Sequence, residues 1–95
     1  MDVEKIIIPV EIEIKIESKH NVRRNEIRQT LINDPRIRFA EKGHVKGNDV
    51  YVAFGRTFGG RYLSVFFIYK PENKTSIIIS ARDMTKKERK AYGKK

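Results

Sequence analysis

The second half of the chain is dominated by stretches in which apolar side chains recur at every second position, the spacing of a β-strand. These candidate strands cover residues 37–39, 49–58, 61–70 and 75–81. Residues 57–61 contain Gly59 and Gly60, where a tight hairpin needs positive φ, and residues 70–74 form a polar loop of hairpin length. The pattern therefore predicts three or four antiparallel strands, each joined to its neighbour in sequence.

The candidate strand over residues 62–69 is apolar on both of its faces. Leu63 and Phe67 fall on one face, and Phe66 and Ile68 fall on the other. We expect this strand to lie at the centre of the sheet, because an exposed strand of this composition would aggregate.

Helical spacing marks a segment before the strands. Residues 24–33 place Ile27 and Leu31 four positions apart, with Ile32 widening the apolar stripe, and the Asn-Asp-Pro of residues 33–35 ends the pattern. We predict an amphipathic helix whose apolar face packs on the core.

A second helix is predicted at the C-terminal end. Thr85 and Glu88 have the spacing of a capping box, in which the hydroxyl accepts from the backbone of the glutamate and the carboxylate accepts from the backbone of the threonine. The helix is expected to run to Tyr92.

Residues 9–19 support two interpretations. Ile12, Ile14 and Ile16 alternate with charged residues, which is typical of a strand. However, Pro9 suits the first turn of a helix, and Ile12 and Ile16 are also four positions apart. The residues alone favour the strand and leave the helix open.

Length and composition predict one domain over residues 1–95, because single domains typically contain about 100 to 150 residues. A hydrophobic content of 39% is enough for a modest core. The chain has no cysteine and two histidines, so we expect neither disulfides nor a metal site. No apolar run approaches the roughly 20 residues of a membrane span, and no signal peptide is recognisable, so we expect a cytoplasmic protein.

The net charge of +9 is unevenly distributed. Residues 1–35 contain six Lys or Arg against seven Asp or Glu, whereas residues 36–95 contain fifteen against five. This asymmetry indicates a surface for a polyanion or an acidic protein in the second half, although a solvated basic face would give the same count.

The basic residues gather where the last strand meets the last helix. Arg82 ends an apolar run, and the following helix contains four more cations, Lys86, Lys87, Arg89 and Lys90. Such a concentration at one edge of a sheet is typical of a surface that meets phosphates.

Several short motifs stand in the order and spacing of a known family over roughly four-fifths of the chain. They are Lys19-His20-Asn21-Val22, Asp34-Pro35, Gly55-Arg56-Thr57, Gly60-Arg61-Tyr62-Leu63, Ile79-Ser80-Ala81-Arg82, Glu88-Arg89 and Tyr92. Together they resemble the BrnT-type toxins of the RelE-like ribonuclease superfamily. The Ser-Ala-Arg followed by Glu-Arg and Tyr is the most specific part.

The resemblance implies an α+β fold in which N-terminal helices pack on a twisted, mainly antiparallel sheet of three or four strands, followed by a short basic C-terminal helix. It also implies a helix over residues 9–19, which we adopt. The chain departs from the family in lacking a tryptophan and in having Asn21 where glycine is usual. Asparagine, like glycine, tolerates a left-handed backbone.

Metal-independent RNA cleavage, in which the 2′-OH attacks the adjacent phosphate, needs a base, an acid and cations around the phosphate. The residue types and the resemblance together single out catalytic candidates, namely His20, Arg56, Arg61, Arg82 and Tyr92. The candidates for RNA binding are Lys19, Lys86, Lys87, Arg89 and Lys90. Each of them also has a structural interpretation, such as an ion pair of Arg82 with Asp83 or Glu88. His44 and Glu41 are weaker candidates, and no cofactor is expected.

The resemblance implies an endoribonuclease toxin, or mRNA interferase, of a type II toxin–antitoxin system. Its partners would be RNA, a small BrnA-like antitoxin and, through the toxin–antitoxin complex, operator DNA. The alternative is a catalytically inactive BrnT-like module that binds RNA or protein. The sequence leaves open ribosome dependence, base preference, oligomeric state and the identity of the acid and base.

Overall fold

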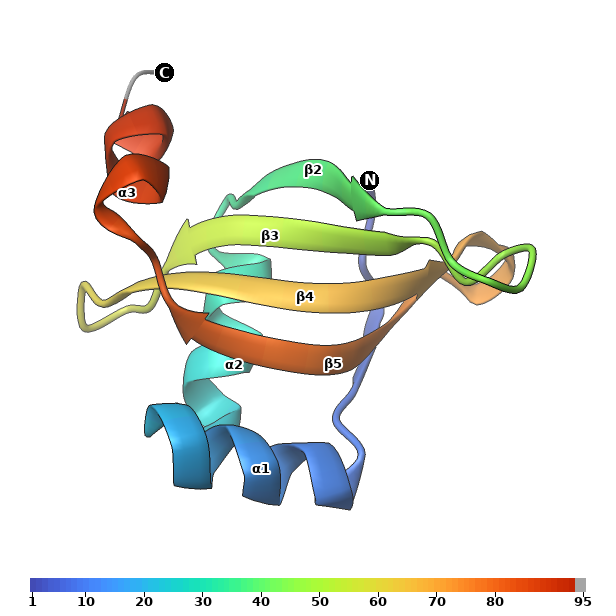
Figure 1. Ribbon diagram of the computed structural model, residues 1–95, viewed down its shortest axis with the longest axis horizontal. Coiled ribbons are helices and arrows are strands. Elements are labelled where there is room, and N and C mark those ends of the chain that lie inside the picture. Colours follow the sequence, from blue (N-terminus) through green and yellow to red (C-terminus); the bar gives the residue numbers. More distant parts are fainter. Residues whose placement is uncertain (94–95) are drawn as a thin grey trace.

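The computed structural model describes residues 1–93, which form one five-stranded sheet and three α-helices (Figure 1). The strands are β1 (Lys5–Ile7), β2 (Arg36–Glu41), β3 (Val50–Arg56), β4 (Tyr62–Lys70) and β5 (Thr75–Asp83). The helices are α1 (Val10–His20), α2 (Arg24–Ile32) and α3 (Lys86–Gly93), with a 3-10 turn, η1, at Pro71–Asn73. The strand order β1-β5-β4-β3-β2 places β4 at the centre, as its two apolar faces predict.

The α+β class is confirmed, but the sheet has five strands rather than three or four, and it is mixed. The additional strand, β1, pairs in parallel with the start of β5, and the Glu4 N–H donates to the Lys74 carbonyl at 2.9 Å beside it. A three-residue strand has too few positions to show a period. Its pairing with a segment far along the chain leaves no local signal.

The segment expected at residues 9–19 forms a helix, α1, over Val10–His20, as the resemblance implied and against the local alternation. In α1, Ile16 is buried and Ile12 packs against the core, whereas Ile14 is 63% exposed. A strand would have placed all three isoleucines on one face, but the helical period turns Ile14 to solvent. Asn21 then ends the helix in the left-handed region at φ 52°.

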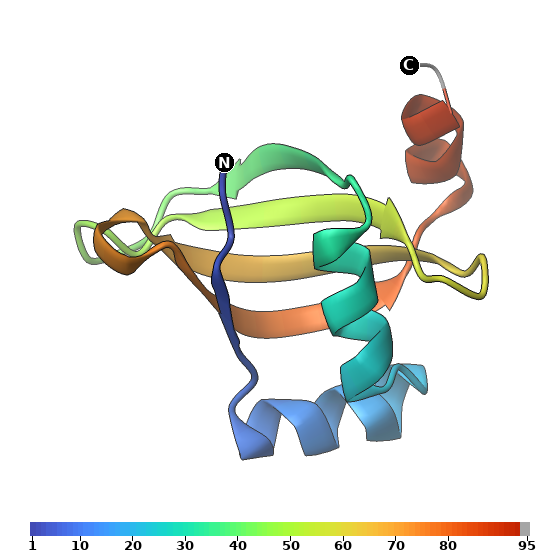
Figure 2. The same cartoon turned by 180° about the vertical axis from the view of Figure 1, so that it is seen from behind.

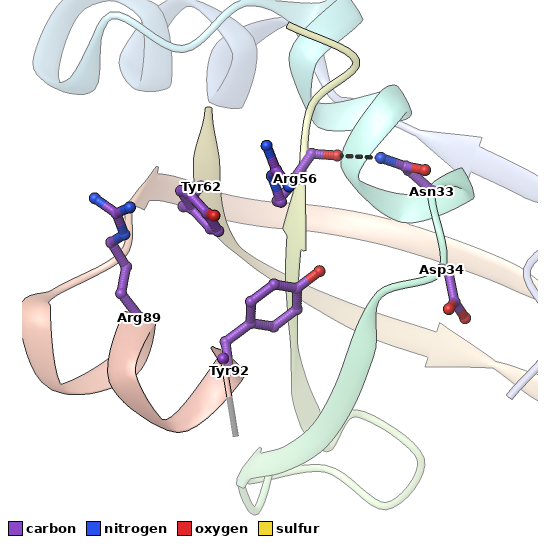
Figure 3. A pocket seen from close by; sticks show the side chains of 7 residues that line it. Asn33, Asp34, Arg56, Tyr62, Arg89 and Tyr92 are labelled. Atoms are coloured by element: carbon purple, nitrogen blue, oxygen red, sulfur yellow. Dashed lines mark hydrogen bonds between the residues drawn. The ribbon is translucent and has the colours of Figure 1, made fainter. Parts of the chain in front are cut away.

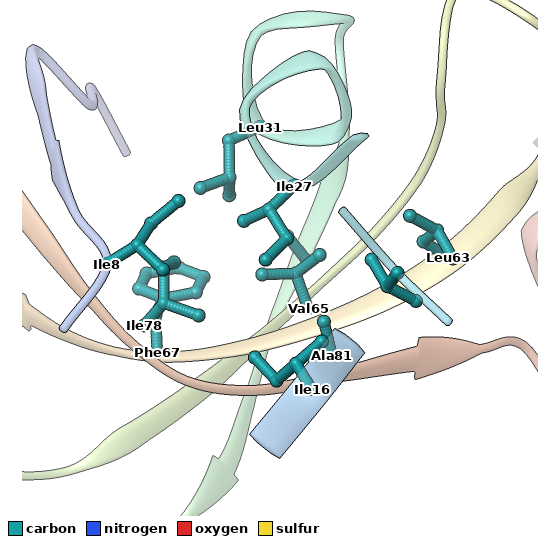
Figure 4. Packing of buried hydrophobic residues seen from close by; sticks show 11 residues of the cluster. Ile8, Ile16, Ile27, Leu31, Leu63, Val65, Phe67, Ile78 and Ala81 are labelled. Carbon is teal, nitrogen blue, oxygen red and sulfur yellow. The ribbon is translucent and has the colours of Figure 1, made fainter. Parts of the chain in front are cut away.

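The core lies between the sheet and the two N-terminal helices (Figures 2 and 4). Figure 2 shows α2 crossing this face of the sheet and α1 lying beside it. The buried cluster includes Ile16 from α1, Ile27 and Leu31 from α2, and Leu63 and Phe67 from β4. Ile32, which was expected to widen the stripe of α2, is instead exposed.

Helix α2 is packed so closely on β3 that Gly55 is required there. A Cβ at Gly55 would lie 3.0 Å from both the Cγ2 and the carbonyl oxygen of Thr30. This contact fixes the end of β3, including the backbone of Arg56, whose carbonyl accepts from Asn33 Nδ2 at 2.9 Å. The segment that follows α2 is therefore held beside the last residue of β3.

The predicted capping box starts α3. The Glu88 N–H donates to Thr85 Oγ1 at 3.1 Å, and the Thr85 N–H donates to Glu88 Oε1 at 2.9 Å. The helix stands at one end of the sheet (Figure 1) and contacts the face that α1 and α2 leave uncovered, since Ser64 donates to Glu88 there. No helix in the described part of the chain is long and apolar enough to cross a membrane.

Candidate active site

Four strands bring polar residues to the end of the sheet beside α3. The register pairs Arg36 of β2 with Phe54 of β3, Phe54 with Ser64 of β4, and Ser64 with Arg82 of β5. Residues that face one another in an antiparallel pair share a face, so this row crosses the face of the sheet opposite the core. One row further out, Arg56 pairs with Tyr62.

A pocket of about 400 Å³, which we call the arginine–tyrosine pocket, opens beside this end of the sheet (Figure 3). Its lining residues are Asn33, Asp34, Arg56, Tyr62, Arg89, Tyr92 and Gly93. They come from the segment after α2, from β3 and β4, and from α3. The site therefore exists only when α3 is docked.

Two guanidinium groups lie over one tyrosine ring in this pocket. The guanidinium carbons of Arg89 and Arg56 lie 4.1 Å and 4.8 Å from the centroid of the Tyr62 ring. Tyr92 meets the same ring edge to face, with centroids 6.0 Å apart. In Figure 3 its hydroxyl end points from α3 toward β3. Such cation–π contacts hold the two guanidinium groups beside the ring, where their N–H groups can still donate to a phosphate.

Arg82, the cation at the strand–helix junction, forms an ion pair with Glu88. Its Nη1 and Nη2 donate to Glu88 Oε1 and Oε2 at 2.7 Å and 3.0 Å, and its guanidinium carbon lies 5.2 Å from the centroid of the Phe66 ring. This forked geometry is the strong form of an arginine–carboxylate contact. The ion pair of Arg82 with Glu88, which was the structural interpretation of this residue, is thus formed. The pair fixes the first turn of α3 to the end of β5.

The same contacts lower the pKa of Glu88 from 4.5 to about 2. The hydrogen bonds from Arg82 contribute most, and those from the Thr85 N–H and the Ser64 hydroxyl add to them, whereas burial opposes the shift. The ionised carboxylate is therefore the form that the folded protein stabilises.

We expect this shift to appear as acid sensitivity. A depressed carboxyl pKa stabilises the fold fully above the unfolded pKa, and the contribution is lost as the pH falls from about 4.5 toward 2. The contribution at pH 7 has an upper limit of about 3 kcal/mol. Urea unfolding at several pH values should show Glu88→Gln less stable than the wild type at pH 7 and nearly equal to it at pH 2. A constant difference between the two proteins across this range would contradict the assignment.

Arg61 and His20 lie outside the arginine–tyrosine pocket. Arg61 donates to both oxygens of Asp83 at 2.7 Å and 3.1 Å, to Glu26 at 3.2 Å, and to the carbonyls of Asn21 and His20 at 2.8 Å and 3.1 Å. The hydrogen bond to Asp83 is the main reason that the pKa of Arg61 is raised and that of Asp83 is lowered. This arginine joins the end of α1, the start of α2 and the end of β5.

The other predicted residues are spread over the surface. Of the cations on α3, Arg89 lines the arginine–tyrosine pocket and Lys87 lines a neighbouring one, while Lys86 and Lys90 are exposed. Lys19 is exposed at the end of α1. The weaker candidates His44 and Glu41 line a separate pocket beside the loop between β2 and β3. Across residues 1–93, no three His, Cys, Asp or Glu side chains gather as metal ligands would.

Sequence reasoning missed several residues of the site. Tyr62 faces Arg56 directly, and a register drawn outward from the turn at residues 57–61 would have paired them. Arg36 and Arg38 lie on one face of β2, a spacing that the alternation around Ile37 already contained. Asn33 and Asp34 gave no signal of strand register, although Asp34 belongs to one of the motifs of the resemblance, because they join the pocket through the packing of α2 on β3.

Comparison with known protein families shows a match over most of the chain. No curated protein sequence matches the chain. The model of one family, described as the ribonuclease toxin BrnT of type II toxin–antitoxin systems, matches residues 13–88, which include both N-terminal helices nearly in full, strands β2 to β5 and the start of α3. The chain therefore belongs to the BrnT family of ribonuclease toxins.

Proposed function

We propose that this protein is a metal-independent endoribonuclease toxin that binds the scissile phosphate in the arginine–tyrosine pocket. Membership of the BrnT family implies an RNA substrate and an antitoxin partner. The observation that carries the proposal further is the convergence of Arg56, Arg89 and Tyr92 on one pocket beside Tyr62. A phosphate would meet two forked cations and a phenol there.

In the proposed reaction the ribose 2′-OH attacks the adjacent phosphate and displaces the 5′-oxygen of the next nucleotide. Arg56 and Arg89 would bind the non-bridging oxygens and stabilise the charge that develops on the phosphorane. Asp34 provides the carboxylate in the pocket lining, and we assign it as the base that accepts the 2′-OH proton. Tyr92 is assigned as the acid that protonates the leaving oxygen.

We assign different roles to the other predicted residues. Arg82 acts as a positioning residue, because its two hydrogen bonds to Glu88 hold α3 and thus Arg89 and Tyr92. Arg61 holds the framework of helices through its contacts with their ends. The exposed lysines of α3 attract the RNA backbone without reading its sequence.

The proposal extends to the partners and the site of action. We propose that the protein acts in the cytoplasm and that its antitoxin is of the BrnA type. The antitoxin would cover the basic end of the sheet. Operator DNA would be bound only by the toxin–antitoxin complex, with the antitoxin reading the sequence.

The proposal is tested by induced expression in bacteria and by incubating purified protein with labelled RNA in EDTA. We expect growth arrest and RNA fragments that end in a 2′,3′-cyclic phosphate. Tyr92→Phe, which keeps the ring that contacts Tyr62 and removes the hydroxyl, should slow cleavage at least about 100-fold. Normal growth, together with intact RNA at protein concentrations that bind it, would contradict the proposed reaction. The protein would then be a binding module that has lost the activity.

A further inference from the structure

A second pocket lies on the same face of the sheet, between α3 and the strands β2 and β3. It has a volume of about 380 Å³, within the range of about 300 to 1,000 Å³ that is usual for small-ligand sites. We call it the α3–sheet pocket, and its lining residues are Arg36, Arg38, Phe54, Lys87, Glu88, Ala91 and Tyr92. Tyr92 also lines the arginine–tyrosine pocket, so one residue separates the two.

The lining combines an apolar wall with cations. Phe54 on β3 and Ala91 on α3 provide apolar surface, and the guanidiniums of Arg36 and Arg38 stand on the β2 side, with the Nη1 of Arg36 3.5 Å from the Ala91 carbonyl. Lys87 adds an exposed ammonium from α3. Apolar aromatic surface next to cations suits a nucleotide, whose flat base stacks on the aromatic ring while its phosphates meet the cations.

Phe54 is the aromatic ring on this face that the pocket exposes. Its neighbours on the same face are engaged within the chain, since Arg82 lies over the Phe66 ring and Arg56 and Arg89 lie over that of Tyr62. Phe54 is partly exposed and faces Arg36 across the β2–β3 pair. Its ring is thus presented to the pocket between a cation on β2 and the first turn of α3.

The carboxylate of Glu88 does not make this pocket repulsive to RNA. Its Oε1 accepts from Arg82, Ser64 and the Thr85 N–H, and its Oε2 accepts from Arg82. The charge is neutralised by a forked ion pair, so the net field in the pocket comes from Arg36, Arg38 and Lys87.

We propose that the α3–sheet pocket binds one nucleobase of the RNA strand, stacked on Phe54, in the nucleotide next to the phosphate held by Arg56 and Arg89. This assignment rests on the proposed function, because it places the cleaved phosphate in the adjoining pocket. The shared Tyr92 wall makes neighbouring positions of one strand the natural occupants of the two pockets. Base stacking here would position the strand for cleavage.

Binding measurements test this inference independently of cleavage. A short fluorescent RNA that is 2′-O-methylated at every position, and so lacks the attacking hydroxyl, is titrated with protein by fluorescence anisotropy. Phe54→Leu removes the ring but keeps an apolar side chain, and it should weaken binding by about 5- to 150-fold. The slope of affinity against salt should stay unchanged, because no cation is lost. The matched control is Phe58→Leu at the exposed β3–β4 turn, which should bind as the wild type does.

A series of RNAs with one abasic position provides a test that needs no substitution. With the wild-type protein, one abasic position should weaken binding as much as Phe54→Leu does, and Phe54→Leu should lose nothing further on that RNA. Equal binding of the whole series, or equal losses for the two leucine variants, would overturn the inference even if RNA is cleaved. Conversely, if Phe54→Leu and one abasic RNA alone bind more weakly but the protein cleaves no RNA, the base site is supported and the proposed reaction is contradicted.

Discussion

Replacing Arg56 with alanine is expected to slow RNA cleavage by about 10²- to 10³-fold, the usual cost of removing one donor to a developing oxyanion. The guanidinium lies in the arginine–tyrosine pocket, 4.8 Å from the centroid of the Tyr62 ring. Its side chain is exposed, so the free energy of unfolding should fall by no more than about 1 kcal/mol, the amount of an exposed cation–π contact. Single-turnover cleavage and urea unfolding of the same preparation measure the two quantities.

Two further variants make the result specific. Arg28→Ala removes an exposed arginine from α2 and should leave the cleavage rate within about twofold of the wild type, because surface charge acts weakly at a distance in salt. Arg56→Lys keeps the charge without the fork and should recover part of the rate. If Arg56→Ala cleaves as fast as Arg28→Ala, the phosphate is bound somewhere other than this pocket.

Replacing Arg61 with alanine should instead destabilise the fold, by about 2 to 3 kcal/mol. The guanidinium donates to Asp83, to Glu26 and to the carbonyls of Asn21 and His20, so one truncation leaves several acceptors without their donor. The expected loss is at the lower end of the range for buried pairs, because 27% of the side chain is exposed. Urea titration at pH 7 measures it directly.

The surface pair of Arg24 and Glu13 provides the matched control. Their side chains also meet at 2.9 Å, but that of Arg24 is 45% exposed, so Arg24→Ala should cost under about 1 kcal/mol. The RNA cleavage rate of Arg61→Ala, measured where the variant is still folded, should stay within about tenfold of the wild type. If Arg61→Ala is as stable as Arg24→Ala but no longer cleaves RNA, Arg61 is a catalytic residue rather than a structural one.

The strands were predictable because their signal is local. The apolar alternation and the turn glycines located β2 to β5 and identified β4 as central. The same local signal was misleading at residues 9–19, where Ile12, Ile14 and Ile16 stand at alternate positions but only Ile12 and Ile16 face the core. Periodicity cannot decide between a strand and a helix when both spacings fit, and the tertiary contact decides.

The residues predicted for one site lie in different places because local sequence does not show on which face of the sheet a side chain lies. Arg56 and Arg61 belong to one hairpin. Because Arg56 pairs with Tyr62, the residue after Arg61, the side chains of the two arginines lie on opposite faces of the sheet. The residue types that suit phosphate chemistry were recognisable in the sequence. Which face of the sheet each side chain lies on could be decided only from the strand register. Asn33 and Asp34 depended on helix packing as well.

The attachment of α3 has a consequence for how the protein loses activity. This helix of eight residues contributes Arg89 and Tyr92 to the pocket, and the Arg82–Glu88 pair and the ring of Tyr92 fasten it to the sheet, outside the main buried cluster. Peripheral elements of this kind open with less free energy than the core. Heat, or a pH lowered from about 4.5 toward 2, would then release α3 while the sheet stays folded, giving a population that is native by most spectroscopic measures and inert toward RNA.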